Sequence, residues 1–162
     1  MTVQTVIITM NKLSQLHESL LSLSRKKTEA LKSNDTEELQ MLLTQERKHV
    51  QAITQVDGKR AAAVEQWYQS NDLTLNDPTI SEMLKYMEGN EKGQLQEAYE
   101  AMILVLSNLK EQEQLNKELT QQSLQFINLS LDMLQPTLGN VNYGNKSDKS
   151  EQPKRSVFDS KA

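Results

Sequence analysis

Apolar residues recur every three or four positions over most of the chain, a spacing typical of amphipathic α-helices. The first such run extends from Val3 to Leu31 and drifts slowly around the helix. A second run extends from Leu39 to Trp67, and the polar stretch SNDTEE separates the two. Two long amphipathic helices joined by a short polar turn bury their apolar faces by packing against each other. The pattern therefore predicts a long antiparallel helical hairpin.

Polar residues predict the start of the second helix and a short third one. Asp35 and Glu38 form a pair similar to a capping box, in which each side chain satisfies a backbone N–H near the other. The stretch SNDLTLNDPT ends the second helix. Asp77 then supplies an N-cap and Pro78 a first helical position, which predicts a short helix over residues 78–87.

The last predicted helix is also the longest. Glu88, Gly89 and Asn90 predict a stop or kink before it, so it runs from about Glu91 to Leu134. Its predicted end is at Gln135-Pro136, because proline lacks a backbone donor and disfavours helix in the residue before it. Residues 136–162 are rich in Gly, Asn, Ser and Lys, which predicts a flexible polar tail. The predicted organisation is a helical domain over 1–135 and a tail over 136–162.

The last helix carries two apolar stripes instead of one. At 100° per residue, a first sector is apolar at the start of the helix, polar in the middle and apolar again at the end. Its members are Leu95, Ala98, Met102, Val105, Leu106 and Leu109, then Glu113, Asn116, Thr120 and Ser123, then Leu124, Ile127, Leu131 and Leu134. The opposite sector carries Leu115, Leu119, Phe126, Leu129 and Met133.

The turns from about Leu124 to Leu134 are therefore apolar on opposed sides, and three interpretations follow. The hairpin arms wrap this end from both sides, the protein forms a homodimer there, or one face binds the amphipathic helix of a partner. The methionines, including Met133, are more often core residues than a binding surface, although methionine adapts to several partners.

Composition agrees with an all-α protein of one domain. The chain has 162 residues, of which 36% are hydrophobic, 4% aromatic and 25% charged. Its formal charge of −4 disfavours nucleic-acid binding, although residues 145–162 alone are net +2. Without cysteine it has neither disulfides nor thiol chemistry, and no apolar window approaches a membrane span. We expect a soluble cytoplasmic protein with no stable membrane insertion.

The sequence offers no chemistry for an enzyme or a metal cofactor. Glu46 and His49 have the Glu-x-x-His spacing of a di-iron site, which needs a second copy and two more carboxylates. Ser14 stands where His17 would need its glutamate, so the second copy is missing. Nucleophile motifs and glycine-rich phosphate loops are absent as well. We predict no catalytic residue, metal or cofactor.

The architecture, with its tail, resembles the FlgN family of chaperones for flagellar type III export. The resemblance rests on the helical hairpin, the apolar final turns of the last helix, and a tail that contains Tyr143-Gly144-Asn145 and ends Phe158-Asp159-Ser160-Lys161-Ala162. The similarity in architecture extends over the whole chain, whereas only the tail resembles a motif of the family in its individual residues. The resemblance implies a cytoplasmic chaperone that prevents the premature assembly of its clients.

The resemblance also implies partners and binding residues. The clients are the C-terminal helical regions of the hook-associated proteins FlgK and FlgL, which the chaperone delivers to the export gate protein FlhA. Tyr143 and Phe158 become candidates for docking at the gate, and the alternative for Phe158 is that it packs against the hairpin. Carried onto this sequence, the client surface comprises Leu115, Leu119, Phe126, Ile127, Leu129, Met133 and Leu134.

The missing chemistry and the long helices fit another class of protein equally well. A structural coiled-coil adaptor, or a helical protein that self-associates, needs no client. It predicts dimers that form through the face from Leu119 to Met133 as the concentration rises. Binding of a hook-associated protein distinguishes the two hypotheses.

Overall fold

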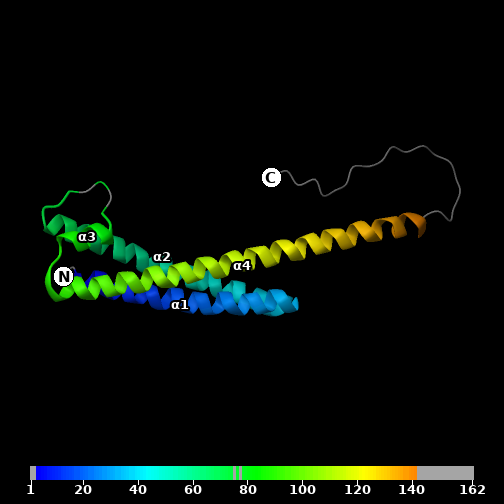
Figure 1. Ribbon diagram of the computed structural model, residues 1–162, viewed down its shortest axis with the longest axis horizontal. Helices are drawn as coiled ribbons and strands as arrows, with labels where there is room; N and C mark the ends of the chain where they lie inside the picture. The colour runs from blue at the N-terminus through cyan, green and yellow to red at the C-terminus, as the bar shows by residue number, and fades with distance from the viewer. Residues whose placement is uncertain (1–2, 75, 77, 142–162) are drawn as a thin grey trace. The chain divides into compact units, whose positions relative to one another are not determined.

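The computed structural model describes residues 3–74, 76 and 78–141, with side chains described as far as residue 134. Figure 1 shows helices α1 (Val3–Ser33), α2 (Thr36–Ser70), α3 (Ile80–Tyr86) and α4 (Gly89–Val141). No strand occurs within these ranges. The predicted all-α fold, with a long hairpin, a short helix and a third long helix, is therefore confirmed. None of the described helices is both long and apolar enough to cross a membrane.

The turn between α1 and α2 combines two capping devices. Asn34 adopts the left-handed conformation with φ 55°, and the N–H of Asp35 donates to the carbonyl of Ala30 at 3.0 Å, which closes α1 with a Schellman motif. The Asp35 side chain then accepts from the N–H of Glu38 at 3.0 Å, as predicted. The reciprocal bond expected from the Glu38 side chain does not form, because the Asp35 N–H is already used by Ala30.

The start of α3 differs from the prediction. Pro78 lies outside the helix, and Thr79 is the N-cap whose hydroxyl accepts from the N–H of Glu82 at 3.2 Å. The predicted cap, Asp77, lies outside the described residues. The Tyr68 hydroxyl also donates to the Thr79 carbonyl at 3.0 Å, which ties this cap to α2. The predicted break before α4 lies at Met87 and Glu88, and α4 begins at Gly89, whose φ of +76° favours glycine.

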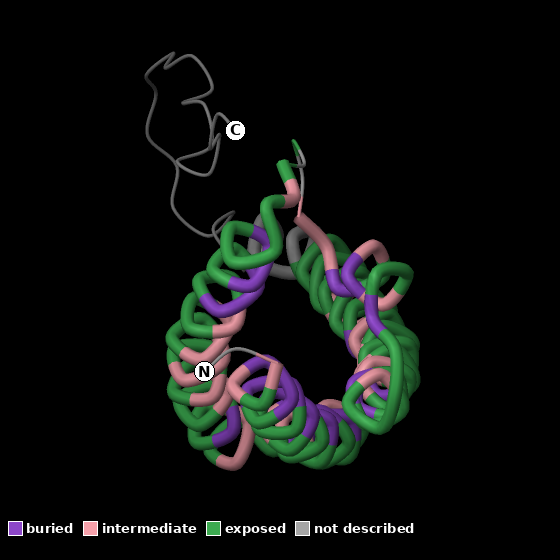
Figure 2. Tube along the Cα trace, turned by 90° about the vertical axis from the view of Figure 1, so that its left-hand side faces the viewer, coloured by how far each residue is buried: buried purple, intermediate pink, exposed green. Residues whose placement is uncertain are grey.

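An apolar cluster joins all four helices at the end of the hairpin where α3 lies. Figure 2 shows buried positions on the sides of the helices that face one another. Two of the deepest side chains are Met83 of α3 and Leu95 of α4, both 0% exposed. The buried members are Val6, Ile7, Met10, Ala63, Val64, Trp67, Tyr68, Ile80, Met83, Met87, Leu95 and Ala98. Burial of this apolar surface is the main force that holds these helices together.

The first part of α4 runs parallel to α1. Ser14 contacts Met102, Ser24 contacts Glu113, and Thr28 contacts Asn116. Both members of each pair advance together along the sequence, so the two helices point the same way. Since α1 and α2 are antiparallel, α4 is antiparallel to α2 (Figure 1).

The chain divides into two units, with the boundary between Gln122 and Ser123 inside α4. The predicted end of the last helix at Leu134 is wrong, because α4 continues through Pro136 to Val141. Proline removes only its own N–H and disfavours, without forbidding, helix before it. The predicted division into a domain over 1–135 and a tail over 136–162 stays a prediction.

Candidate functional site

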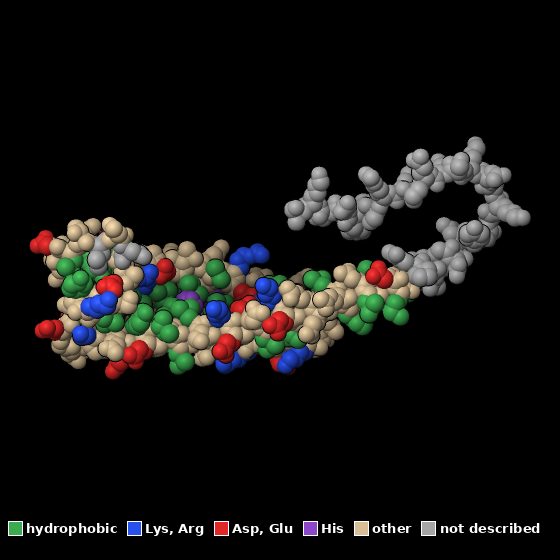
Figure 3. Space-filling model, turned by 45° about the horizontal axis from the view of Figure 1, so that its top comes forward, with side chains coloured by type: hydrophobic (Ala, Val, Ile, Leu, Met, Phe, Trp, Pro, Cys, Tyr) green, Lys and Arg blue, Asp and Glu red, His purple; other side chains and the backbone are tan. Residues whose placement is uncertain are grey.

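The predicted client surface is strongly exposed in the last turns of α4 that have described side chains. Phe126 and Met133 are each 70% exposed, although a large apolar side chain is usually buried. Figure 3 shows apolar side chains gathered on these turns. The exposed large apolar residues in this segment are Leu124, Phe126, Ile127, Leu129, Leu131, Met133 and Leu134.

Helix geometry arranges these side chains in two stripes. Phe126, Leu129 and Met133 are spaced by three and four positions, so they share one side of the helix. Leu124, Ile127, Leu131 and Leu134 follow the same spacing on the other side. Within residues 124–134 the apolar side chains of both stripes are exposed, and we name these residues the apolar end of α4. Its two sides can contact two helices of a partner, or two neighbouring turns of one wrapped segment.

The apolar end of α4 is almost free of charge. Asp132 is the only charged residue between residues 119 and 141. By contrast, residues 110–118 of the same helix contain five charged residues, which are Lys110, Glu111, Glu113, Lys117 and Glu118. A partner would therefore meet a surface on which apolar burial, with little charge attraction, supplies the binding energy.

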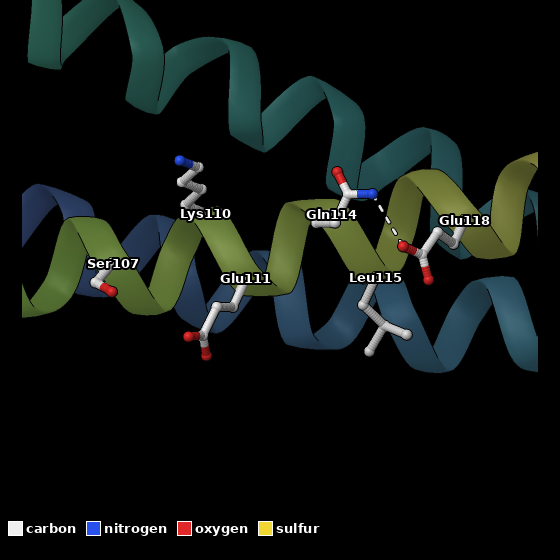
Figure 4. A pocket seen from close by; sticks show the side chains of 6 residues that line it. All are labelled: Ser107, Lys110, Glu111, Gln114, Leu115 and Glu118. Atoms are coloured by element: carbon white, nitrogen blue, oxygen red, sulfur yellow. Dashed lines mark hydrogen bonds between the residues drawn. The ribbon is translucent and has the colours of Figure 1, made fainter.

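The two remaining residues of the predicted client surface lie in the first unit. Leu115 is exposed and borders a wide concavity of about 720 Å³, where its neighbours are Ser107, Lys110, Glu111, Gln114 and Glu118 (Figure 4). All of these residues belong to α4, so the concavity is a polar helix flank instead of an enclosed site. Leu119 is half-buried. Leu115 and Leu119 therefore differ from the strongly exposed residues 124–134, because Leu115 has polar neighbours and Leu119 is partly covered.

The proposed residues for docking at the export gate, Tyr143 and Phe158, lie outside the described residues. Their roles stay predictions.

A second apolar surface was not anticipated from the sequence. It is a groove of about 370 Å³ in the first unit, lined by α1, by Asp57 and Arg60 of α2, by the middle of α4 and by the residues around the cap of α3. Met10, Met102, Ile103 and Leu106 supply apolar lining, and Ile103 is half exposed at 50%. The helical spacing placed Met102 and Leu106 on one apolar stripe of the last helix. It could not show that part of this stripe lines an open groove, because that depends on how the other helices pack against it.

Lys27 is the most enclosed cation among the described ion pairs. Its Nζ lies 2.7 Å from Oε1 of Glu46 and 3.1 Å from both carboxylate oxygens of Glu113. Burial by itself lowers the pKa of Lys27, but its contacts with Glu46 and Glu113 and the charges of the two carboxylates outweigh this effect and raise it. Oε1 of Glu46 is buried without a well-aligned hydrogen bond, so the charge of Lys27 compensates its burial. This triad links α1, α2 and α4.

Glu46 and His49, which have the Glu-x-x-His spacing, and His17 all have partners within the protein. The Glu46 carboxylate pairs with Lys27, and Nε2 of His49 lies 2.8 Å from the Ser19 hydroxyl. His17 is buried, with Nδ1 2.8 Å from the carbonyl of Leu13. Among the described residues, no group of three or more His, Cys, Asp or Glu side chains could hold a metal ion.

Comparison with known proteins adds an independent finding. A family model described as FlgN protein matches residues 1–151. A protein of Bacillus subtilis (strain 168), described as the uncharacterized protein YvyG, is 42% identical over 167 aligned residues that cover 100% of both chains. No solved structure matches the chain.

Proposed function

The chain belongs to the FlgN family of flagellar export chaperones, and from this premise we propose that its clients are the hook-associated proteins FlgK and FlgL. In this proposal it binds their C-terminal helical regions, prevents their assembly before export, and delivers them to the gate protein FlhA. It acts in the cytoplasm, where clients wait for the gate.

The observation that carries the proposal is the exposed apolar end of α4. Phe126, Leu129 and Met133 on one side, and Ile127 and Leu134 on the other, are all more than half exposed. A patch of this kind makes a free protein prone to association, so it favours a role in which another helix covers it. An amphipathic helix matches it best, because residues spaced by three and four positions interdigitate with the same spacing on a partner.

The client surface is graded in this proposal. Phe126, Leu129 and Met133 provide the centre of the contact, and Ile127 and Leu134 contact the client from the other side. Leu115 and Leu119 belong to its edge, since Leu115 is surrounded by polar groups and Leu119 is half-buried. Side chains at the centre of an interface usually contribute most of the binding energy.

Delivery to the gate is assigned to the tail. In this proposal Tyr143 and Phe158, which follow the client surface in the sequence, contact the gate and leave the client surface to the client. An aromatic side chain in a polar segment can anchor in a pocket with little loss of conformational entropy. A Tyr143→Ala variant is therefore expected to lose affinity for FlhA and to keep it for FlgK.

Isothermal titration with purified FlgK and FlgL tests the client assignment. Each client is used at full length and without its C-terminal helical segment. We expect saturable one-to-one binding with a Kd between about 1 μM and tens of nanomolar, roughly −8 to −10 kcal/mol, because the client must be released for export. Binding should disappear with the truncation. Undiminished binding of the truncated clients would contradict the proposal.

The competing function, self-association without a client, is favoured by the same exposed stripes. Light scattering of this protein alone distinguishes it. A stable dimer mass, together with no heat from either hook-associated protein, would replace the client proposal with an adaptor that associates through the face from Leu119 to Met133.

A further inference from the structure

The contact between α1 and α4 changes character along its length. Near the start of α4, Leu95 and Ala98 belong to the apolar cluster, and Val105 is buried as well. Beyond Val105, Asn116 is the one buried residue of α4 among those with described side chains, and it is only 3% exposed. The first stretch of the contact is thus apolar and the second is polar.

Asn116 sits at the centre of a hydrogen-bond network with α1. Its Nδ2 donates to the Ser24 carbonyl at 2.9 Å and to the Ser24 hydroxyl at 3.0 Å. The Thr28 hydroxyl donates to Asn116 Oδ1, and the Gln112 amide donates to the Thr28 hydroxyl. Since Ser24 and Thr28 are also buried, this part of the contact consists of satisfied polar groups.

Charged groups extend the network on one flank. The Ser24 hydroxyl donates to the Glu113 carboxylate, which also contacts Lys27. Water can replace each of these partners when the helices separate, so the hydrogen bonds lost are largely regained. Separation at the apolar stretch offers no such compensation, because it would expose Leu95 and Val105 to water.

Beside the network, α1 and α2 also pack against each other through an apolar cluster of their own. Leu23 and Ala30 of α1 pack with Leu42 of α2, and Leu39 is partly buried against them. This second apolar cluster holds α1 to α2 without a member from α4. Opening of the polar contact therefore leaves the hairpin closed.

We propose that this network is a latch. The segment of α4 from Ser107 to Gln122 opens away from α1 and closes again, while the stretch up to Val105 stays clamped in the apolar cluster. We name the network of Ser24, Lys27, Thr28, Gln112, Glu113 and Asn116 the polar latch. This inference concerns the free protein and goes beyond the proposed function, because it requires no client.

A buried polar network can also serve only to fix the register of two helices. A register device keeps α4 closed at all times, whereas a latch populates an open state. The two roles therefore differ in the distance distribution between α1 and α4 at the level of the network.

Paired spin labels measure this distribution by double electron–electron resonance, and the absence of native cysteine makes labelling specific. The latch pair is Glu29→Cys with Lys117→Cys, at exposed positions beside the network. The matched base pair is Asn11→Cys with Glu97→Cys, also exposed, whose native residues line one concavity between α1 and α4. None of the four positions belongs to the polar latch.

We expect one narrow distance for the base pair and a second, longer population for the latch pair. Adding Ser24→Ala, Thr28→Val and Asn116→Leu to the latch pair replaces the three buried polar side chains of the network by apolar ones. It should lower the ratio of open to closed molecules about fivefold to tenfold, equivalent to ~1–1.4 kcal/mol. The proposal is overturned if the latch pair is as narrow as the base pair, or if the triple substitution leaves the open population unchanged. Should the triple variant fail to fold, the comparison of the two pairs alone decides.

Discussion

The two ends of the described α4 have similar side chains and opposite surroundings. Leu95 and Ala98 near its start are buried in the apolar cluster, whereas Leu129 and Met133 near its end are more than half exposed. Periodicity determines which residues share a face of the helix. Whether that face becomes core or binding surface depends on which other elements cover it. The first stretch therefore stabilises the fold, and in the proposed function the second stretch is the surface that binds the client.

The largest expected effect concerns the buried end. Leu95 is 0% exposed, so Leu95→Ala should lower the free energy of unfolding by about 2–5 kcal/mol through the lost burial and the cavity it leaves. Leu129→Ala is the matched control, because the same substitution at an exposed position should cost less than about 0.5 kcal/mol. Urea denaturation measures both. Equal losses would show that the apolar end of α4 is part of the core.

The next effect concerns the exposed end. Phe126→Ala and Leu129→Ala should each weaken binding of the FlgK C-terminal region by about 1–3 kcal/mol, which is roughly five- to 150-fold. The free energy of unfolding should stay nearly constant. Ile103→Ala is the control, since Ile103 is another exposed apolar residue of α4, at 50%, and lines the groove in the first unit.

A reversed result, in which Ile103→Ala weakens binding and the double substitution of Phe126 and Leu129 does not, would move the client site to the groove.

A smaller effect is expected at Lys27 of α1, whose partner Glu113 lies between the two ends of α4. Because its folded pKa is raised above the ordinary value of 10.5, its contribution to stability is complete below about that pH. The contribution is then lost as the pH rises through the folded pKa. Lys27→Met should lower the free energy of unfolding by about 1–2 kcal/mol near neutral pH, since it leaves Glu46 and Glu113 without their cation.

The difference in stability between the unchanged chain and Lys27→Met should shrink at alkaline pH, which denaturation curves from about pH 8 to about pH 12 can follow. Lys32→Met is the control, because Lys32 forms an exposed pair with Glu29 and should matter by less than about 0.5 kcal/mol. A difference for Lys27→Met that stays constant up to the highest pH would contradict the assignment.

The smallest effect is the response of client binding to salt. With Asp132 as the only charge between residues 119 and 141, affinity should change less than about twofold between about 50 and about 500 mM salt. Titration calorimetry at both concentrations measures it. A tenfold fall would show that charged residues such as Lys110 and Glu111 contact the client.

The regular part of the fold could be predicted from the sequence because it depends on local spacing. The hairpin follows from apolar positions every three or four residues, and Asp35 caps α2 as predicted. The cap of α3 was misassigned although its signal is local. Thr79 followed by Glu82 is the usual pair of a capping box. The neighbouring Asp77-Pro78 also fits the start of a helix, so the prediction placed the cap at Asp77 instead of Thr79.

The polar contacts of α4 could not be predicted, because they depend on how the helices are aligned. Ser24 and Asn116 are 92 residues apart, and nothing local in either segment indicates the other. Asn116 appeared in the sequence as an interruption of an apolar stripe, which suggests solvent, whereas the structure buries it against α1. Lys27 and Glu46 are similar, since each belongs to a charged stretch that alone predicts a solvated helix face.

Methyl NMR of this protein during titration with FlgK tests whether the client binds at the apolar end of α4. Leucine, isoleucine and methionine methyl groups report separately on the apolar end of α4, through Ile127, Leu129 and Met133, and on the groove, through Ile103 and Leu106. We expect saturable shifts at the apolar end and unchanged signals in the groove. Shifts confined to the groove would contradict binding of the client at the apolar end. Signals at the apolar end that change when the free protein is diluted, but do not change when FlgK is added, would contradict it as well.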